Sequence, residues 1–425
     1  MKKIARPKAN AKIVPGKSLK VNIFWNTLGS LAYQGCLWLT TIMVVVFSSD
    51  YRSSGMLALA MTIGNMFSPI ATYNIRIFQI SDTAGKYSQS DYVGFRIQTL
   101  LLGVALLLPY TFIVGIDTAT ILVILLFLLF KIDESFCDVL YGVNQRYERM
   151  DFTGKSQLLR GILLIAAFCF ALITTGSLQI ACAAMFLACI AVTFLYDVRR
   201  SSSLDSIAPK FDKMLTVQML KECAPLVVGA LCMSSVVSIA RQYYGGTFGV
   251  ENLGIYAAVA TPAVIVQALA RFLYAPVLTP LANLLAENVS SFIRFLVKTL
   301  CLILLLSVVA VLLLSIIGPP LLVMLYGDDI AGYTYLFTPV LISTVFIVVA
   351  GFLNDVLTIL RKLWSFALSM FIALVLCAAM MVPLEGIFGM NGINLVIICA
   401  MGISAVFSAA IIIIKIREIK KSLST

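Results

Sequence analysis

Ionisable and polar side chains recur at helical spacing between residues 131 and 145. The residues are Lys131, Glu134, Asp138, Tyr141 and Gln145, which follow one another at steps of 3, 4, 3 and 4. An α-helix has about 3.6 residues per turn, so this spacing places all five on one face. Asp133 departs from that face, which weakens any functional role for it.

Two carboxylates on this face are candidates for ion coupling. Glu134 and Asp138 are neighbours on a helix, and in a poorly hydrated site their repulsion favours a proton on one of them. Lys131 opposes this effect if it pairs with Glu134. Two interpretations follow, a proton or cation site coupled to conformational change and a purely structural Lys131–Glu134 pair. Asp355, beside Asn354, is a second candidate nearer the end of its helix.

Other kinds of chemistry have little support in the sequence. The chain has no histidine, and its ten cysteines form no CxxC pair, so we expect no metal site. Gly-Lys-Ser occurs at 16–18 and at 154–156, but the glycine that a P-loop needs five residues earlier is absent at both places. We therefore expect no ATP binding, no cofactor and no covalent catalysis.

The composition sets the environment in which these residues must work. Hydrophobic residues make up 61% of the 425 residues, and charged residues only 12%. A water-soluble protein cannot cover that much apolar surface, which excludes a soluble enzyme, a nucleic-acid binder and a disordered scaffold. The sequence predicts an all-α polytopic membrane protein, since only helices satisfy their backbone groups within one segment in lipid.

Twelve stretches are apolar enough to cross a bilayer core, which takes about 20 residues of helix. They are residues 22–47, 55–77, 96–114, 119–141, 157–175, 178–196, 222–241, 252–274, 295–317, 337–360, 363–382 and 393–414. An even number of spans places both termini on one side. Most of the 31 lysines and arginines, Arg96 and Arg160 among them, fall on that side, so the positive-inside rule predicts cytoplasmic termini. Orientation thus explains the net charge of +11 without a nucleic-acid partner.

The longest loop between spans divides the chain into six spans plus six. The predicted parts are a cytoplasmic tail (1–20), an N-lobe (21–200), a cytoplasmic linker (201–216), a C-lobe (217–415) and a C-terminal tail (416–425). Polar stripes occur on spans 1, 2 and 4 and again on spans 7, 8 and 10. Because this set repeats after six spans, we expect two pseudo-symmetric six-helix lobes, as in transporters built from parallel repeats. The structural alternative is that polar residues near helix ends reach toward the membrane surface.

Three groups of residues resemble the polysaccharide and O-antigen (lipid-linked oligosaccharide) flippases of the multidrug/oligosaccharidyl-lipid/polysaccharide exporter superfamily. They are 22–26 with Gly29 and 33–35; 141–142 with Gln145 and 149–151; and 325–329 with Ala331, Tyr333 and 360–362. The likeness in the number and order of spans covers nearly the whole chain. The resemblance implies two six-helix bundles that close alternately on either side of a central cavity.

The resemblance also implies a cargo, a glycan repeat unit on a polyprenyl diphosphate that moves from the inner to the outer leaflet. Cavity cations would compensate the diphosphate, and the candidates are Arg76, Lys131, Arg241 and Arg271. Sugar hydroxyls suit amides and tyrosines, and the candidates are Asn26, Tyr33, Gln34, Asn65, Gln79, Tyr141, Gln145, Gln267 and Tyr274. The alternative for the amides and tyrosines is hydrogen bonding between helices.

Two other functions stay open at this point. One is a multidrug cation antiporter of the same superfamily, which cavity cations disfavour because they repel a cationic drug. The other is a membrane-embedded glycan polymerase or transferase, which short outer loops disfavour. The favoured interpretation is a secondary transporter, not an enzyme, in a bacterial cytoplasmic membrane. It would be driven by a proton or sodium gradient, with polysaccharide assembly proteins as possible neighbours.

Overall fold

The computed structural model describes residues 15–48, 50–82, 87–274 and 277–424. The chain is helical throughout these ranges except at short turns, at 15–18 and in the loop 203–212. The helices are α1 (Leu19–Phe47), α2 (Tyr51–Thr72), α3 (Ile75–Ser81), α4 (Gln89–Val114), α5 (Thr118–Arg146), α6 (Met150–Thr175), α7 (Leu178–Val192), α8 (Val198–Ser202), α9 (Lys213–Phe248), α10 (Val250–Tyr274), α11 (Leu278–Glu287), α12 (Val289–Tyr326), α13 (Phe337–Ile359), α14 (Leu363–Phe388) and α15 (Met390–Ser424). A π-helical turn (Thr193–Asp197) joins α7 to α8, and a 3-10 helix (Asp328–Leu336) precedes α13.

The twelve predicted spans coincide with helices of this set. Only the second is interrupted, at Tyr73 and Asn74, where α2 gives way to α3. Ten helices in the described part of the chain are long and apolar enough to cross a membrane. Helix α5 is not among them, because it carries four charged residues within 131–138, namely Lys131, Asp133, Glu134 and Asp138. The protein is a multi-pass membrane protein.

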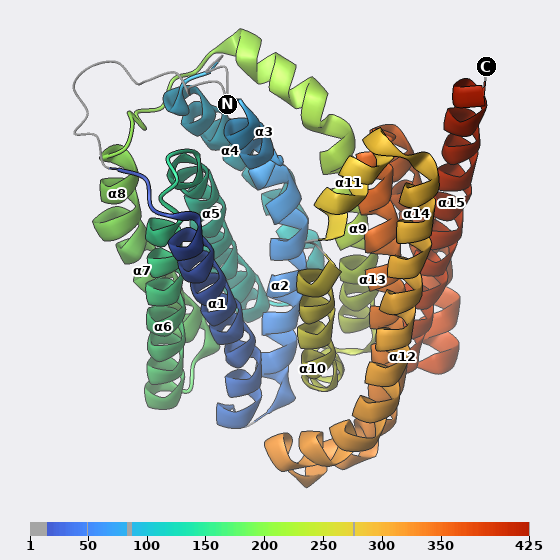
Figure 1. The fold of residues 1–425 in the computed structure, drawn as a ribbon. Helices are drawn as coiled ribbons and strands as arrows, with labels where there is room; N and C mark the ends of the chain where they lie inside the picture. The colour runs from blue at the N-terminus through green and yellow to red at the C-terminus, as the bar shows by residue number, and fades with distance from the viewer. Residues whose placement is uncertain (1–14, 49, 83–86, 275–276, 425) are drawn as a thin grey trace. The chain divides into compact units, whose positions relative to one another are not determined.

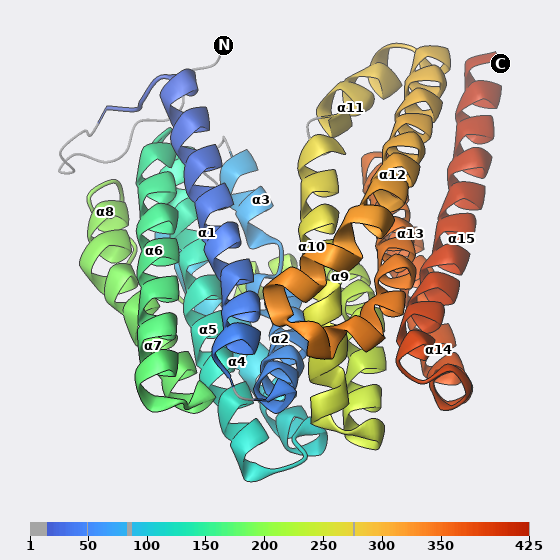
Figure 2. The same cartoon turned by 90° about the horizontal axis from the view of Figure 1, so that it is seen from below.

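The chain divides into two compact units, Met1–Val227 (unit 1) and Val228–Thr425 (unit 2). The boundary lies within α9, beyond the predicted linker at 201–216. In unit 1, α1 packs along α6, as Figures 1 and 2 both show. Helix α5 is the central element of this unit, since it contacts α2, α4, α6 and α7.

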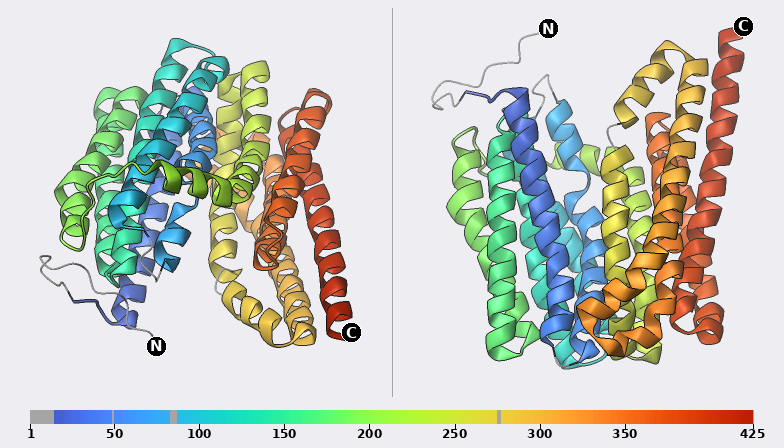
Figure 3. Two further views of the ribbon diagram at one scale, coloured as in Figure 1. Left: turned by 90° about the horizontal axis from the view of Figure 1, so that it is seen from above. Right: turned by 60° about the horizontal axis from the view of Figure 1, so that its bottom comes forward.

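Unit 2 repeats the neighbour relations of unit 1. Its central helix is α13, which contacts α10, α12, α14 and α15. Counted as spans, α13 is the tenth and α5 the fourth, so the two units have equivalent central helices six spans apart. Helix α15 packs against α13 and α14, and Figure 3 shows it as the long red helix that ends at the C-terminus. The internal repeat inferred from polar stripes therefore has a counterpart in the packing of each unit.

The α1–α6 contact depends on two glycines. A Cβ atom on Gly29 would lie 2.1 Å from the carbonyl oxygen of Gly154, and one on Gly154 would lie 2.0 Å from that of Trp25. Real Cβ atoms do not approach backbone so closely, so any side chain at either position must separate the two helices. Close packing through small residues is a common way to join helices in membranes, where lipid removes the hydrophobic incentive.

We expect Gly29→Ala to destabilise unit 1 by about 1–3 kcal/mol, the usual cost of overpacking. The matched control is Gly35→Ala on the same helix, because a Cβ atom on Gly35 meets no atom within 4 Å. The control should be neutral or slightly stabilising, since alanine favours a helix over glycine by about 0.5–1 kcal/mol. Thermal unfolding of the detergent-solubilised variants measures both effects. Equal unfolding temperatures for the two variants would contradict the close contact.

Candidate functional site

The second membrane span of unit 1 is broken near one end. Tyr73 and Asn74 adopt left-handed backbone conformations, with φ of 49° and 52°, and they separate α2 from α3. Such residues cost about 1–3 kcal/mol each and concentrate at functional sites. Pro69 lies one turn earlier and removes one helical N–H donor. The break exposes backbone groups that must find partners inside the protein.

A buried arginine from α4 provides a hydrogen-bond donor for a backbone carbonyl at this break. The Arg96 side chain is fully buried, and its Nη1 donates to the carbonyl oxygen of Ala71 at 2.8 Å. Thr99 Oγ1 donates to the same carbonyl at 2.7 Å. Arg96 Nη2 reaches Asp138 Oδ2 on α5 at 2.7 Å. Arg96 therefore joins α2, α4 and α5 at one point.

A second arginine shares the same carboxylate. Arg76 on α3 donates from Nη1 to Asp138 Oδ1 at 3.2 Å and from Nη2 to Gln145 Oε1 at 2.9 Å. Two guanidinium groups thus surround one carboxylate, which leaves a formal excess of one positive charge. Arg76 is 27% exposed, whereas Arg96 is fully buried. The excess charge is accessible through Arg76.

Arg76 lines a pocket of about 310 Å³ in unit 1. The lining residues are Thr72, Asn74, Arg76, Ile77, Ile80 and Asp138. The pocket lies at the end of unit 1 where α1 begins and α5 ends, since Lys17 N bonds to Glu148 O at 3.0 Å and Gln145 binds Arg76. Its polar rim and single uncompensated charge suit an anion with an attached organic group. We name this feature the Arg76 pocket.

The predicted ion-coupling acid Asp138 is therefore part of a cationic cluster. Both of its oxygens accept from arginines, Oδ1 from Arg76 and Oδ2 from Arg96, so its immediate partners are guanidinium groups. Arg96 was missed as a functional residue, because it stands at the first position of the predicted span 96–114 and resembles a charge at the membrane surface. Helix α4 instead begins at Gln89. The signal was available in the polar stripe that Gln89, Tyr92, Arg96 and Thr99 form on one helical face.

The other predicted acid, Glu134, is held by two partners. Lys131 Nζ lies 2.5 Å from Glu134 Oε2, and the Tyr33 hydroxyl on α1 donates to Glu134 Oε1 at 2.8 Å. Lys131 is buried, with its Nζ 5.8 and 5.6 Å from the ring centres of Phe127 and Phe130. This geometry matches the structural alternative, in which Lys131 and Glu134 stabilise each other.

A double-mutant cycle tests this pair. We expect Lys131→Met and Glu134→Gln each to lower the stability by about 1–3 kcal/mol, because each leaves a poorly hydrated charge without its partner. The double variant should cost less than the sum of the single variants, since it removes both charges. Denaturation of the four purified proteins measures the coupling. Additive effects would show that the two side chains do not stabilise each other.

A more deeply buried charge network lies beside Glu134 on another face of α5. Arg160 on α6 bonds to Asp133 and lies 3.5 Å from Asp197 Oδ2, and all three side chains are at most 4% exposed. Thr193 Oγ1 accepts from Arg160 at 2.7 Å and donates to Asp133 Oδ1 at 2.6 Å. Thr193 and Asp197 begin and end the π-helical turn, an irregularity that often marks a functional site. Two carboxylates share one guanidinium, and the Cys137 thiol lies 3.6 Å from Asp197 Oδ2.

Most of this network was absent from the sequence-based site. Asp133 was set aside because it departs from the polar face of its helix, and Arg160 was counted among the cytoplasmic charges. Both assignments treat α5 as a helix with one important face. Because α5 is the central helix of unit 1, its different faces contact different helices. Asp138 binds arginines of α3 and α4, and Asp133 binds an arginine of α6.

The predicted sugar-binding residues of unit 1 are either engaged in hydrogen bonds with other side chains or accessible. Gln79 and Tyr141 are buried in contacts between helices: Gln79 donates to Gln89 Oε1 at 2.8 Å, and the Tyr141 hydroxyl lies 3.0 Å from Ser156 Oγ. Gln145 and Tyr33 are held by Arg76 and Glu134, as described above. The accessible ones are Asn65, which is exposed, and Asn26 and Gln34, which are half-buried.

The predicted binding and coupling residues of unit 2 form no network like that around Asp138 among the described residues. Arg241 on α9 is half-buried with its Cζ 5.5 Å from the Tyr256 ring centre, and Tyr274 is buried against Phe352. Gln267 is half-buried on α10. The Arg271 side chain lies outside the described residues. Asp355 is half-buried, whereas its neighbour Asn354 accepts from Ser408 Oγ at 3.0 Å.

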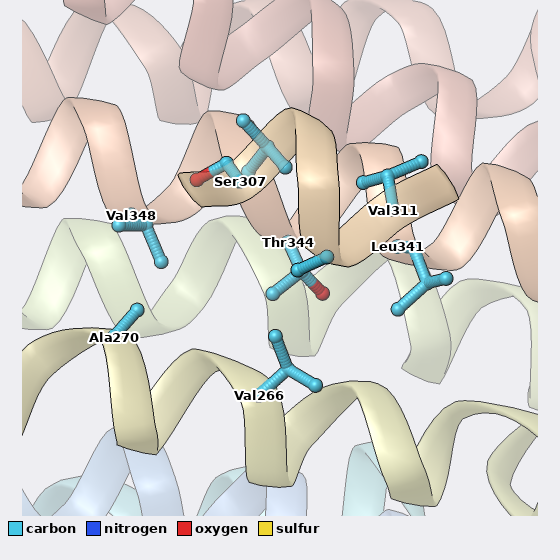
Figure 4. Close-up of a pocket in the computed structure, with 9 residues that line it drawn as sticks. Val266, Ala270, Ser307, Val311, Leu341, Thr344 and Val348 are labelled. Carbon is cyan, nitrogen blue, oxygen red and sulfur yellow. The ribbon is translucent and has the colours of Figure 1, made fainter. Parts of the chain in front are cut away.

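A small pocket of unit 2 is unsuited to a charged cargo. Its volume is about 20 Å³, close to the space of one water molecule, and its lining is almost entirely apolar. Figure 4 shows side chains from α10, α12 and α13 around it. The labelled residues are Val266, Ala270, Ser307, Val311, Leu341, Thr344 and Val348.

Comparison with known proteins identifies the fold. No protein-family model and no curated protein sequence matches the chain. The fold is similar to an inward-facing multidrug resistance MATE family transporter of the MOP superfamily, with a TM-score of 0.72 and 14% identity over 95% of this chain and 99% of that one. It is also similar to the lipid II flippase MurJ in an inward closed conformation, with a TM-score of 0.69 and 13% identity over 94% and 89%. An outward-facing MATE transporter matches with a TM-score of 0.61 and 14% identity over 98% and 100%. The chain therefore has the fold of MOP superfamily transporters.

Proposed function

We propose that this protein is a flippase that moves a polyprenyl-diphosphate-linked oligosaccharide, a surface-polysaccharide repeat unit, from the inner to the outer leaflet. The cell membrane would be a bacterial cytoplasmic membrane, with both termini in the cytoplasm. The single observation that carries the proposal is the Arg76 pocket, an accessible hollow with an excess positive charge. The resemblance of the motifs to O-antigen flippases and the fold shared with MurJ support it.

The Arg76 pocket suits a phosphorylated headgroup for three reasons. The guanidinium offers planar donors that match phosphate oxygens. Arg96 neutralises Asp138, so a phosphate near Arg76 meets no uncompensated carboxylate. The pocket also lies at the end of unit 1 that carries the N-terminal segment, which is the cytoplasmic end in the proposed orientation. An inner-leaflet headgroup would enter there.

The remaining predicted contacts are assigned according to their exposure. Asn26, Gln34 and Asn65 are the best candidates in unit 1 for sugar hydroxyls, because their amides are accessible. Arg241, Arg271, Gln267 and Tyr274 are proposed to serve the same cargo from unit 2. Glu134, Asp138 and Asp355 remain the proposed acids for coupling to a proton or sodium gradient.

The alternative is a multidrug cation antiporter. The fold shared with a multidrug resistance MATE transporter supports this alternative. The charge of the cargo distinguishes the two proposals. A cationic drug would be repelled from an excess positive charge, whereas a diphosphate would be attracted. The Arg76 pocket is thus expected to bind a diphosphate and to exclude a cationic drug.

Deletion of the gene in its own cell tests the proposal. Lipid-linked oligosaccharide should accumulate in the cytoplasmic leaflet, and the wild-type gene should relieve this accumulation. Resistance to cationic drugs should stay unchanged. Drug sensitivity without accumulation of the lipid would contradict the proposal and favour the antiporter.

A further inference from the structure

Unit 2 contains a buried acid to which the proposed function assigns no role. Glu385 lies near the end of α14, and its side chain is fully buried. Neither carboxyl oxygen has a hydrogen-bond partner among the residues that the structure describes. None of the ion pairs found among those residues involves Glu385. Every other acid that is this deeply buried in the described chain, such as Asp133, Asp151 and Asp197, faces an arginine.

The surroundings of Glu385 offer little to stabilise a negative charge. The titratable groups that interact electrostatically with it are Tyr244 on α9, Tyr256 on α10 and Cys377 on α14, which are neutral near pH 7. The hydroxyl of Tyr256 already donates to Asn394 Oδ1 on α15 at 2.8 Å. Further out, Tyr333 and Tyr335 interact with Tyr244. We name Glu385 and its three neighbours the Glu385 cluster.

A charged group, Arg241, contacts this cluster through Tyr256. It lies beside Tyr256, with its Cζ 5.5 Å from the ring centre, and a side-chain hydrogen bond joins the two residues. Its buried Nε has no hydrogen-bond partner among the described residues. No N···O distance of 4.0 Å or less joins Arg241 to Glu385 in the described structure. Tyr256 thus interacts with both an acid and a base that form no ion pair with each other in the described structure.

Backbone packing holds Glu385 at this position. A Cβ atom on Gly392 of α15 would lie 2.5 Å from Glu385 Cα, so the two helices touch there. Gly389, with φ of 55°, ends α14 and donates its N–H to the Glu385 carbonyl oxygen at 2.9 Å. The helix end cannot shift to bring the carboxyl group to the surface without disrupting the α14–α15 turn.

A buried carboxylate without a partner is far more costly than a neutral carboxylic acid. A metal ion is a poor explanation, because it requires several oxygen ligands and no group of three or more His, Cys, Asp and Glu side chains could hold one among the described residues. A single proton neutralises Glu385 and needs no further ligand. Membrane acids in such surroundings commonly take part in proton transfer.

We propose that Glu385 is a proton-binding site of unit 2, occupied by a proton in the conformation described here. Release of the proton would leave a carboxylate that attracts Arg241 across Tyr256, so protonation and the packing of α9 against α14 would be linked. As the coupling site of a flippase, this role rests on the proposed function. Proton binding by Glu385 does not rest on the proposed function. An experiment can therefore contradict proton binding and the proposed function separately.

Infrared difference spectroscopy of the purified full-length protein tests the proposal without any cargo. The protein is titrated from acidic to alkaline pH, and the C=O stretch of protonated carboxyl groups is followed. We expect wild type to keep one buried protonated carboxyl at neutral pH, where exposed acids are ionised. Glu385→Gln should remove that band, and Glu385→Asp should retain it at a shifted position.

The matched control is Glu251→Gln, the same substitution at an exposed acid in the first turn of α10. It should leave the band unchanged. Glutamine resembles a protonated glutamate in shape, so Glu385→Gln should also remain monodisperse in size-exclusion chromatography. An unchanged band in folded Glu385→Gln, or no such band in wild type, would overturn the proposal. A band with no transport of lipid-linked oligosaccharide would overturn only the proposed function.

Discussion

Replacement of Arg76 with glutamine is expected to weaken binding of a polyprenyl diphosphate by about 10- to 150-fold. Hydrogen bonds to charged groups contribute about 1.5–3 kcal/mol each, and about 1.4 kcal/mol corresponds to a factor of ten. Arg76 is the exposed member of its cluster, so it is the guanidinium that a headgroup can reach. Titration of the detergent-solubilised protein with a short-chain polyprenyl diphosphate measures the affinity.

The Arg76→Gln variant should fold normally. Asp138 keeps its shorter contact to the fully buried Arg96, so no unpaired carboxylate is left behind. Arg76→Lys should retain part of the affinity, because lysine supplies the charge without the planar pair of donors. A Gln145→Ala variant serves as a control for the loss of the Arg76–Gln145 bond alone. Unchanged affinity in Arg76→Gln would exclude the pocket as the headgroup site.

Removal of Arg160 should have the largest effect on stability. Arg160→Met leaves Asp133 and Asp197 buried and uncompensated, and the loss of one partner from a buried ion pair costs about 3–5 kcal/mol. We expect little monodisperse protein after solubilisation and a much lower unfolding temperature. Size-exclusion chromatography followed by thermal unfolding measures both.

Two further variants separate charge from packing in this network. Arg199→Met is the matched control, because Arg199 is exposed near the end of the same unit. The triple variant Asp133→Asn, Arg160→Met, Asp197→Asn removes all three charges and should recover much of the stability, since an uncharged replacement of a buried network is often neutral. A triple variant no better than Arg160→Met would contradict the electrostatic explanation.

The spans were predictable from the sequence because lipid forces long apolar helices, and hydropathy reports them directly. The repeat of six spans was also visible, since polar residues recur on the first, second and fourth spans of each half. The central positions of α5 and α13 match these stripes. Helix α2 is the exception, because the left-handed residues Tyr73 and Asn74 are stabilised by contacts with α4 that no local pattern records.

The candidate site was only partly predictable. Arg76, Lys131 and Glu134 were identified from the sequence, and so was the pairing of Lys131 with Glu134. The contacts of Arg76 with Asp138 and Gln145, and of Tyr33 with Glu134, were not. Arg96 and Arg160 were assigned to the membrane surface, because a charge count treats any basic residue near a span boundary as a loop residue. Both sit deep in the protein, since α4 and α6 begin about two turns before the predicted spans and carry these side chains inward.

Glu385 illustrates another limit of sequence reasoning. It lies just beyond the predicted span 363–382, where an acid is expected to reach water. Helix α14 continues to Phe388, and the contact with Gly392 encloses the side chain. Burial here results from a turn between two helices, which depends on tertiary packing and not on hydropathy.

Transport by the purified protein in sealed vesicles tests the central claim most directly. The vesicles carry a fluorescent polyprenyl-diphosphate oligosaccharide in one leaflet, and a membrane-impermeant quencher reports its arrival in the other. We predict that wild type moves this lipid, that Arg76→Gln moves it at least about tenfold more slowly, and that a cationic dye in parallel vesicles is not transported. Transport of the dye by wild type, with the glycolipid left in its original leaflet, would contradict the account.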